Sequence, residues 1–213
     1  MKKESEMKRS YLIYGEGTND GSKPSKRNGK HLKEYLVWRA MICRCYSKYS
    51  LGLKPSYTKT EISENFKSYA YFYDWCQNQI GFKSEGFVFD KDILGFRYNI
   101  YSENVCAFIP QTLNKLLTLR QRDRSPYGLG VQKVNKSKRG ILRFKSSIGA
   151  GVSGVSLLSP LTFDTALEAH EDYIQRKTAF IIAQAETYKA VLDPRVYLAL
   201  LTPNLKERIS CLN

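Results

Sequence analysis

The chain has 213 residues, a formal net charge of +14, and 42% hydrophobic and 13% aromatic residues. This length corresponds to one or two domains, and the apolar content is sufficient for a packed core, which excludes a disordered chain. No stretch approaches the roughly 20 consecutive apolar residues of a membrane-spanning helix. The amino terminus has no apolar signal-peptide core, so we expect a cytoplasmic protein without membrane contact.

The cysteines do not indicate a disulfide framework, because they are odd in number and lack the C-x-x-C spacing of a zinc ribbon. They are Cys43, Cys45, Cys76, Cys106 and Cys211. We expect them to be reduced and mostly buried. A zinc site formed by the first four is an alternative, although side chains at positions 43 and 45 of one helix point in different directions.

The first 31 residues are rich in Lys, Ser, Gly and Asn, which predicts a mostly flexible basic arm with one short anchored piece at residues 11–14. Apolar residues then recur at helical spacing over residues 32–45 and again near residues 64–79, which predicts two amphipathic helices. The loop between them, near residues 47–60, suits either contact with nucleic acid or cover of the core. Its distinctive residues are Tyr49, Lys54, Pro55, Tyr57 and Lys59.

Residues 87–114 read FVFDKDILGFRYNIYSENVCAFIPQTLN and resemble an HNH nuclease motif. A β-prone run ends at Asp90, whose carboxylate suits a hard cation, and Asn114 offers a neutral oxygen from the next helix. The resemblance implies Mg²⁺ or another divalent metal held by Asp90 and Asn114. It also implies that Asn104 ties the intervening loop together through bonds to the backbone.

Lys91 stands where the HNH motif has its catalytic histidine. A lysine with an ordinary pKa of about 10.4 is already protonated at neutral pH and is a poor general base. A nearby metal lowers that pKa, whereas the adjacent Asp90 and Asp92 raise it. A cluster of two Asp and one Lys with Mg²⁺ can still position water or stabilise phosphate charge, with Asp92 beside the metal or as a ligand. Alternatively, Asp90 and Asp92 simply end a strand and cap a turn.

The positive charge is concentrated in residues 111–145, which hold ten basic residues and one acidic residue. Neutralisation of phosphates is the natural use of such a segment. A solvated basic face is the alternative. The candidate DNA-binding residues are Arg120, Arg122, Arg124, Lys133, Lys136, Lys138, Arg139, Arg143 and Lys145.

Three short strands are predicted at residues 128–134, 140–147 and 155–158. A long helix follows, because Thr165 and Glu168 form a capping-box pair. Such a β-β-β-α unit can lay its sheet into a major groove, with Lys133, Arg143 and Lys145 facing outward. A further helix is predicted from Pro194 to residue 201, followed by a tail or cap after residue 203.

Seven segments together resemble phage and prophage-encoded HNH-like homing endonuclease relatives that carry an appended ethylene-response-type DNA-binding domain. They are YGEGTND (14–20), WRAMICRCY (38–46), ENFKSYAYFYDW (64–75), FDKDIL (89–94), YSENVCAFIPQTLN (101–114), YGLGV (127–131) and FDTALEAHEDYIQRK (163–177). The resemblance implies a DNA-interacting protein with a hairpin-and-helix metal core and a carboxy-terminal sheet that reads DNA.

We therefore expect an α+β protein with a basic arm (1–31), a helical and HNH-like core (32–122) and a β-β-β-α DNA-binding domain with carboxy-terminal helices (123–213). The expected function is metal-dependent endonuclease activity on double-stranded DNA, of the homing or phage-competition type. The first alternative is an inactive DNA-binding protein with a regulatory or counter-defence role. The second is a protein that binds an acidic host protein. The sequence leaves the oligomeric state open.

Overall fold

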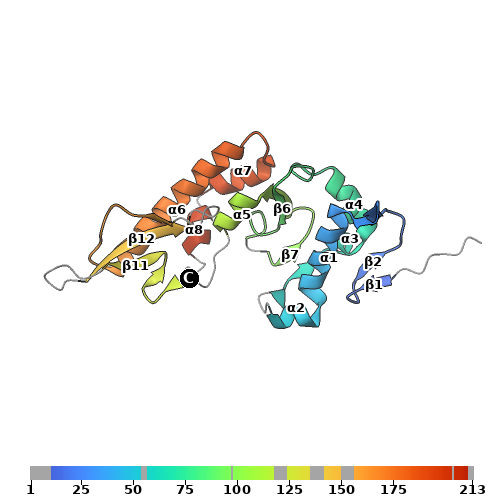
Figure 1. Cartoon of the computed structure of the whole chain (residues 1–213), viewed down its shortest axis with the longest axis horizontal. Coiled ribbons are helices and arrows are strands. Elements are labelled where there is room, and N and C mark those ends of the chain that lie inside the picture. The colour runs from blue at the N-terminus through green and yellow to red at the C-terminus, as the bar shows by residue number, and fades with distance from the viewer. Residues whose placement is uncertain are drawn as a thin grey trace, which may run out of the picture. The chain divides into compact units, whose positions relative to one another are not determined.

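The computed structural model describes residues 11–53, 57–96, 98–117, 124–134, 142–149, 156–202 and 204–210. Helices and small sheets alternate along the chain, so the fold is α+β, as predicted (Figure 1). The contacts divide the chain into two units. Unit 1 comprises Met1–Glu85 and Phe89–Phe108, and unit 2 comprises Gly86–Val88 and Ile109–Asn213.

Unit 1 begins with two antiparallel hairpins at residues 11–31, where the composition predicted a mostly flexible arm. The first joins β1 (Tyr11–Ile13) to β2 (Gly17–Asn19), and the second joins β3 (Lys26–Arg27) to β4 (Lys30–His31). The second turn has positive φ at Asn28 and Gly29, the backbone that an Asn-Gly hairpin turn adopts. The first hairpin is anchored because Gly17 lies tightly against Trp38. Residues 1–10 of the predicted arm lie outside the described residues.

Four helices follow: α1 (Lys33–Tyr46), α2 (Lys48–Leu53), α3 (Glu64–Lys67) and α4 (Tyr69–Gln77). The single helix expected near residues 64–79 is thus two helices. The break falls at Ser68, which is extended and accepts a hydrogen bond from the Tyr71 N–H as the N-cap of α4. Trp38, Phe66 and Phe72 are fully buried in the core of unit 1.

Short strands complete unit 1 and connect it with unit 2. β5 (Glu61–Ile62) pairs in parallel with β7 (Ile100–Tyr101). β6 (Phe87–Asp90) pairs with β8 (Ala107–Pro110), and α5 (Gln111–Leu117) follows directly. The chain from residue 87 to 117 therefore runs through β6, a loop that contains the short strand β7, then β8 and α5. The division between the units falls within β6 and β8.

Unit 2 contains the predicted three-stranded antiparallel sheet, in the order β11 (Val131–Val134), β12 (Arg143–Gly149), β13 (Ser156–Leu158). The strand predicted at residues 128–134 is divided at Gly130, which has a φ of +70°, so that β10 (Gly128–Leu129) pairs with β9 (Arg124–Ser125) instead. The sheet packs on α6 (Ala166–Tyr188) through a cluster of Val131, Phe144 and Ala169.

The helices of unit 2 begin at the predicted residues. Thr165 and Glu168 form the capping box of α6, and Asp193 caps α7 (Pro194–Leu201). The segment after residue 203, expected to be a tail or cap, forms α8 (Asn204–Ser210). The domain boundary expected at residues 122–123 stays a prediction. By its contacts α5 belongs to unit 2 with α6, and the Thr112 hydroxyl lies 2.8 Å from that of Tyr188.

Candidate functional site

Asp90 ends β6 and is 9% exposed. Its Oδ1 accepts hydrogen bonds of 2.9 Å from the backbone N–H groups of both Asp92 and Ile93. The carboxylate therefore caps the turn after β6, which is the local role that the sequence left open. These bonds engage one oxygen and fix the orientation of the whole carboxylate.

Lys91 is the buried cation of this loop. Its side chain is 10% exposed, its Nζ lies 2.6 Å from Asp92 Oδ1, and the same nitrogen lies 5.6 Å from the centroid of the Tyr101 ring. An ion pair and a cation–π contact are both interactions of a charged ammonium. The two contacts hold the Lys91 side chain in place within the loop.

A second cation reaches the same region from α1. The Arg44 guanidinium hydrogen-bonds to the Tyr101 hydroxyl, and burial raises the pKa of that hydroxyl. Burial also raises the pKa of the Cys45 thiol to about 11, although Lys91 and Arg44 both oppose this shift. Arg44 and Tyr101 were not singled out in the sequence. The sequence feature that could have identified Arg44 is its place as a basic residue within the apolar stripe of residues 38–45.

Asn104 is exposed in the turn before β8, and the neighbouring Glu103 has an anchoring role that the sequence analysis missed. The Glu103 carboxylate accepts hydrogen bonds from Asn65 Nδ2 at 2.7 Å and from Ser63 Oγ at 3.2 Å. The pKa of the Glu103 carboxyl is below its ordinary value. Burial alone would raise this pKa, but hydrogen bonds from its own backbone and from Asn65 together have the larger effect and lower it. Glu103 therefore fastens the loop to the beginning of α3.

Asn114 lies half-buried on α5 in unit 2, whereas Asp90 lies in unit 1. Joint ligation of one metal by these two residues stays a prediction. The donor types fit a magnesium ion, which proteins usually hold through one or two carboxylates together with substrate phosphates and water. Within the described part of the chain, no three His, Cys, Asp or Glu side chains gather into a metal-binding group.

The cysteines in the described ranges are free thiols, as predicted. Cys45, Cys76 and Cys106 are buried, and burial raises the pKa of all three thiols. The zinc alternative finds no support among the described residues. Cys211 lies outside them.

The candidate DNA-binding residues are described only in part. Arg120, Arg122, Lys136, Lys138 and Arg139 lie outside the described residues, and of Arg124 only the backbone is described. The remaining three are Lys133, Arg143 and Lys145, all near or on the sheet of unit 2.

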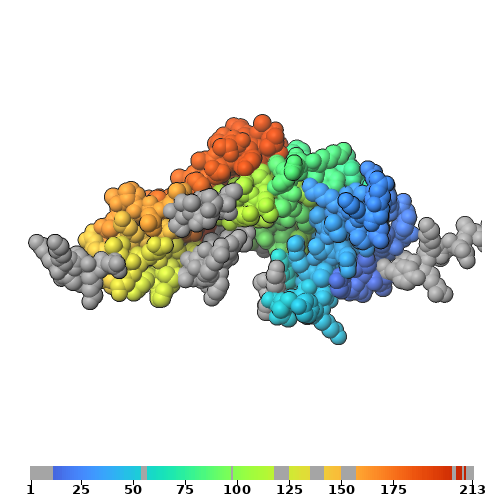
Figure 2. Space-filling model, in the orientation of Figure 1, coloured from blue at the N-terminus to red at the C-terminus, as the bar shows by residue number. Residues whose placement is uncertain are grey.

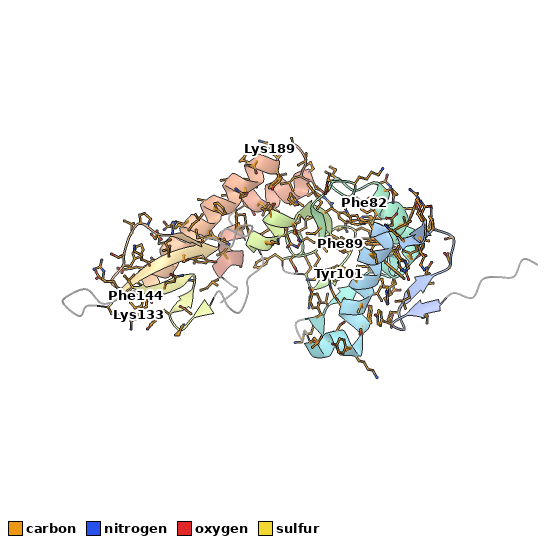
Figure 3. All side chains as sticks on the ribbon, viewed as in Figure 1. Phe82, Phe89, Tyr101, Lys133, Phe144 and Lys189 are labelled. Atoms are coloured by element: carbon orange, nitrogen blue, oxygen red, sulfur yellow. The ribbon has the colours of Figure 1, made fainter. Side chains whose placement is uncertain are left out.

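These three residues do not share one face of the sheet. Lys133 is directly opposite Phe144, and the two residues are neighbours in Figure 3. Phe144 packs toward α6, so Lys133 also lies on the helix side of the sheet, where it is exposed near the end of the strand. Arg143 and Lys145 alternate with Phe144 and lie on the opposite face. The Arg143 guanidinium donates to the Asp164 carboxylate and to the Thr162 carbonyl oxygen at 3.0 Å. Arg143 thus also fixes the loop that precedes α6.

The two histidines have contacts of their own. His31 is exposed on β4 and stacks on Tyr35 with ring centroids 4.8 Å apart. His170 Nδ1 lies 3.0 Å from the Leu129 carbonyl oxygen and must donate, because a carbonyl oxygen only accepts. His170 also lines a cavity of about 410 Å³ together with Tyr127 and other residues of the β9–β10 hairpin and α6. His170 therefore joins α6 to β10 as a hydrogen-bond donor.

Comparison of the chain with protein-family models, with curated protein sequences and with solved structures finds no match. No helix in the described ranges is both long and apolar enough to cross a membrane. A functional proposal therefore depends on the residues and their geometry.

Proposed function

We propose that the protein binds double-stranded DNA and hydrolyses its phosphodiester bonds as a metal-dependent HNH-like endonuclease. The paired strands β6 and β8 and the helix α5 directly after β8 carry this proposal, because an HNH-like core is a strand pair followed by a helix. Asp90 ends the first strand with its carboxylate held by the backbone, and a buried cation follows it. The net charge of +14 favours a polyanionic substrate.

Each residue of the loop has a distinct role in this proposal. Asp90 and Asn114 would hold Mg²⁺, which polarises the phosphate and lowers the pKa of bound water. Lys91 places a positive charge beside the phosphate, where it stabilises the negative charge that develops as water attacks. Asp92 orients Lys91 through the ion pair of 2.6 Å. A water molecule or a substrate oxygen, rather than Lys91, accepts the proton.

The second candidate is a DNA-binding protein without cleavage activity, with a regulatory or counter-defence role. The contacts of Asp90 and Lys91 favour it, because both side chains have structural partners within their own loop. A protein that keeps this loop only for stability would need the same contacts of Asp90 with the backbone and of Lys91 with Asp92.

Nicking of supercoiled plasmid DNA in Mg²⁺ or Mn²⁺ separates the two candidates. We expect nicking by the unmutated protein and its loss in Asp90→Asn and Asn114→Ala. Asp74→Asn is the matched control, because Asp74 is an exposed carboxylate that pairs with Lys23 in unit 1. DNA binding without nicking by the unmutated protein would support the second candidate. Absence of salt-dependent DNA binding would refute both.

Substitution of Lys91 tests its role in the same assay. Lys91→Met keeps most of the buried aliphatic chain and removes the charge, so we expect a nicking rate lower by about 100-fold or more, the usual loss when one charge-stabilising group is removed. Lys91→Arg retains the charge and should recover part of the rate. Equal rates for the Met and Arg variants would contradict the assignment of Lys91 as a charge-stabilising residue.

A further inference from the structure

The short helix α2 presents two large apolar side chains to solvent. Tyr49 is 77% exposed and Leu53 is 65% exposed, and their spacing of four residues places them on one face of the helix. Gly52 beside them has open space around it. No residue of α2 is buried, so this exposed face is not part of the core of unit 1.

The opposite side of α2 attaches to the end of α1. The Ser50 hydroxyl lies 3.2 Å from Cys43 Sγ, and the Leu51 N–H donates to the Ser47 carbonyl oxygen at 2.9 Å. These bonds join α2 to the end of α1 and leave Tyr49 and Leu53 exposed. The space-filling view shows α2 projecting from the rest of unit 1 (Figure 2).

The stretch of sequence that contains this apolar pair carries only positive charges. Residues 35–60 contain five basic residues and no acidic one. Arg39, Lys48 and Lys59 are exposed. An apolar pair within a basic segment complements a ligand that combines apolar surfaces with negative charge, and DNA has both in its base faces and its phosphates.

We infer that α2 inserts Tyr49 and Leu53 between base pairs of duplex DNA. This inference rests on the proposed DNA binding, and it assigns a contact in unit 1 that is separate from the sheet of unit 2. Apolar wedges of this kind partly unstack a base step and kink the duplex. Lys48, the exposed first residue of α2, neutralises a phosphate beside the opened step, which holds the helix against the groove.

Insertion unwinds DNA, and unwinding is measurable without knowledge of a target sequence. Closed circular plasmid is incubated with the protein in EDTA, so that no metal-dependent cleavage occurs, and is relaxed by a metal-independent topoisomerase. The linking number is then read on a gel after removal of protein. We expect a protein-dependent change in linking number that is lost in the double variant Tyr49→Ser/Leu53→Ser.

The matched control is Leu198→Ser on α7, because Leu198 is 61% exposed and lies in unit 2. We expect the control to unwind DNA like the unmutated protein. The double variant should bind DNA at least about fivefold more weakly, the lower end of what one base–aromatic stacking contact contributes. All substituted side chains are exposed, so circular dichroism should show intact folds.

The outcomes distinguish this inference from the proposed function. DNA binding by the unmutated protein with no change in linking number would refute insertion and leave DNA binding standing. No DNA binding at all would refute both. Unwinding by the double variant equal to that of the unmutated protein would also refute insertion and would assign the exposed face of α2 to another partner, such as a protein.

Discussion

Replacement of Gly130 by alanine is expected to destabilise unit 2 severely. Gly130 connects β10 to β11 with a φ of +70°, and its carbonyl oxygen accepts a hydrogen bond of 2.7 Å from the Ser147 N–H. A methyl group at this position would lie 2.1 to 2.5 Å from three ring carbons of Tyr173. Tyr173 is 3% exposed and stacks on His170, so its ring has little room to move.

Two effects contribute to the expected magnitude. A non-glycine residue in the left-handed region costs about 1–2 kcal/mol. Insertion of a methyl group into a packed core costs typically about 1–3 kcal/mol through displaced side chains and backbone. The sum is a loss of about 2–5 kcal/mol in the free energy of unfolding, a large part of the 5–15 kcal/mol that is typical of a folded domain.

Urea denaturation followed by two signals provides the assay. Both tryptophans, Trp38 and Trp75, lie in unit 1, so tryptophan fluorescence reports on unit 1 alone. The helical circular dichroism signal also includes α6 of unit 2. With a slope of about 1–3 kcal/mol per molar urea, we expect the unit 2 part of the circular dichroism transition to move down by about 1 M or more.

Alanine substitutions at two further glycines distinguish backbone strain from steric collision with Tyr173. Gly128 has a φ of +115° with its nearest contact at 4.0 Å, so Gly128→Ala adds strain without collision. Gly149→Ala has open space and no positive φ and should change little. If Gly130→Ala lowers the free energy of unfolding no more than Gly128→Ala does, the Tyr173 ring moves aside at little cost. That result would refute the expected collision.

Three further predictions concern other contacts. Ser146→Ala should destabilise unit 2 by about 1–3 kcal/mol in the same urea assay, because the Ser146 hydroxyl donates to Asp172 at 2.5 Å and accepts from Arg176 at 2.9 Å, and both bonds would be lost. The pKa of the Glu103 carboxyl is lowered in the folded state, so its ionised form stabilises the fold. This stabilisation is complete above the ordinary pKa of 4.5 and is lost as the pH falls below that value. Between pH 7 and pH 3, the free energy of unfolding measured by fluorescence should therefore fall less in Glu103→Gln than in the unmutated protein. An equal fall in both proteins would contradict the stabilising role of the Glu103 carboxylate. Cys43 should be alkylated before Cys45 in a timed reaction read by peptide mass spectrometry. Burial raises the pKa of Cys43, but hydrogen bonds from neighbouring hydroxyls outweigh burial and lower it, whereas burial raises that of Cys45 to about 11.

Features that depend on local chemistry were predicted from the sequence. The start of α6 at the Thr165 capping box and the start of α7 at Pro194 are encoded by neighbouring residues, and both are confirmed. The antiparallel order of three strands before α6 also follows from short turns between β-prone runs. The capping role of Asp90 was among the alternatives that its sequence allowed.

Features that depend on distant residues were not predicted. The hairpins at residues 11–31 are anchored where Gly17 meets Trp38, a contact between segments far apart in the sequence. The face of Lys133 depends on which side of the sheet α6 covers, and composition carries no such information. The approach of Arg44 to Tyr101 requires α1 and β7 to come together, so neither residue was distinctive by itself.

The division between the units falls within β6 and β8, which limits how the gene can be cut into fragments that encode one whole unit. The backbone passes between the units three times, after Glu85, Val88 and Phe108. No single cut yields both units whole, because a chain ending at Phe108 carries Gly86–Val88 away from the rest of unit 2. A gene fragment encoding either unit as one uninterrupted segment would therefore lack part of β6 or β8 or carry residues of the other unit, so recombination should transfer the two units together.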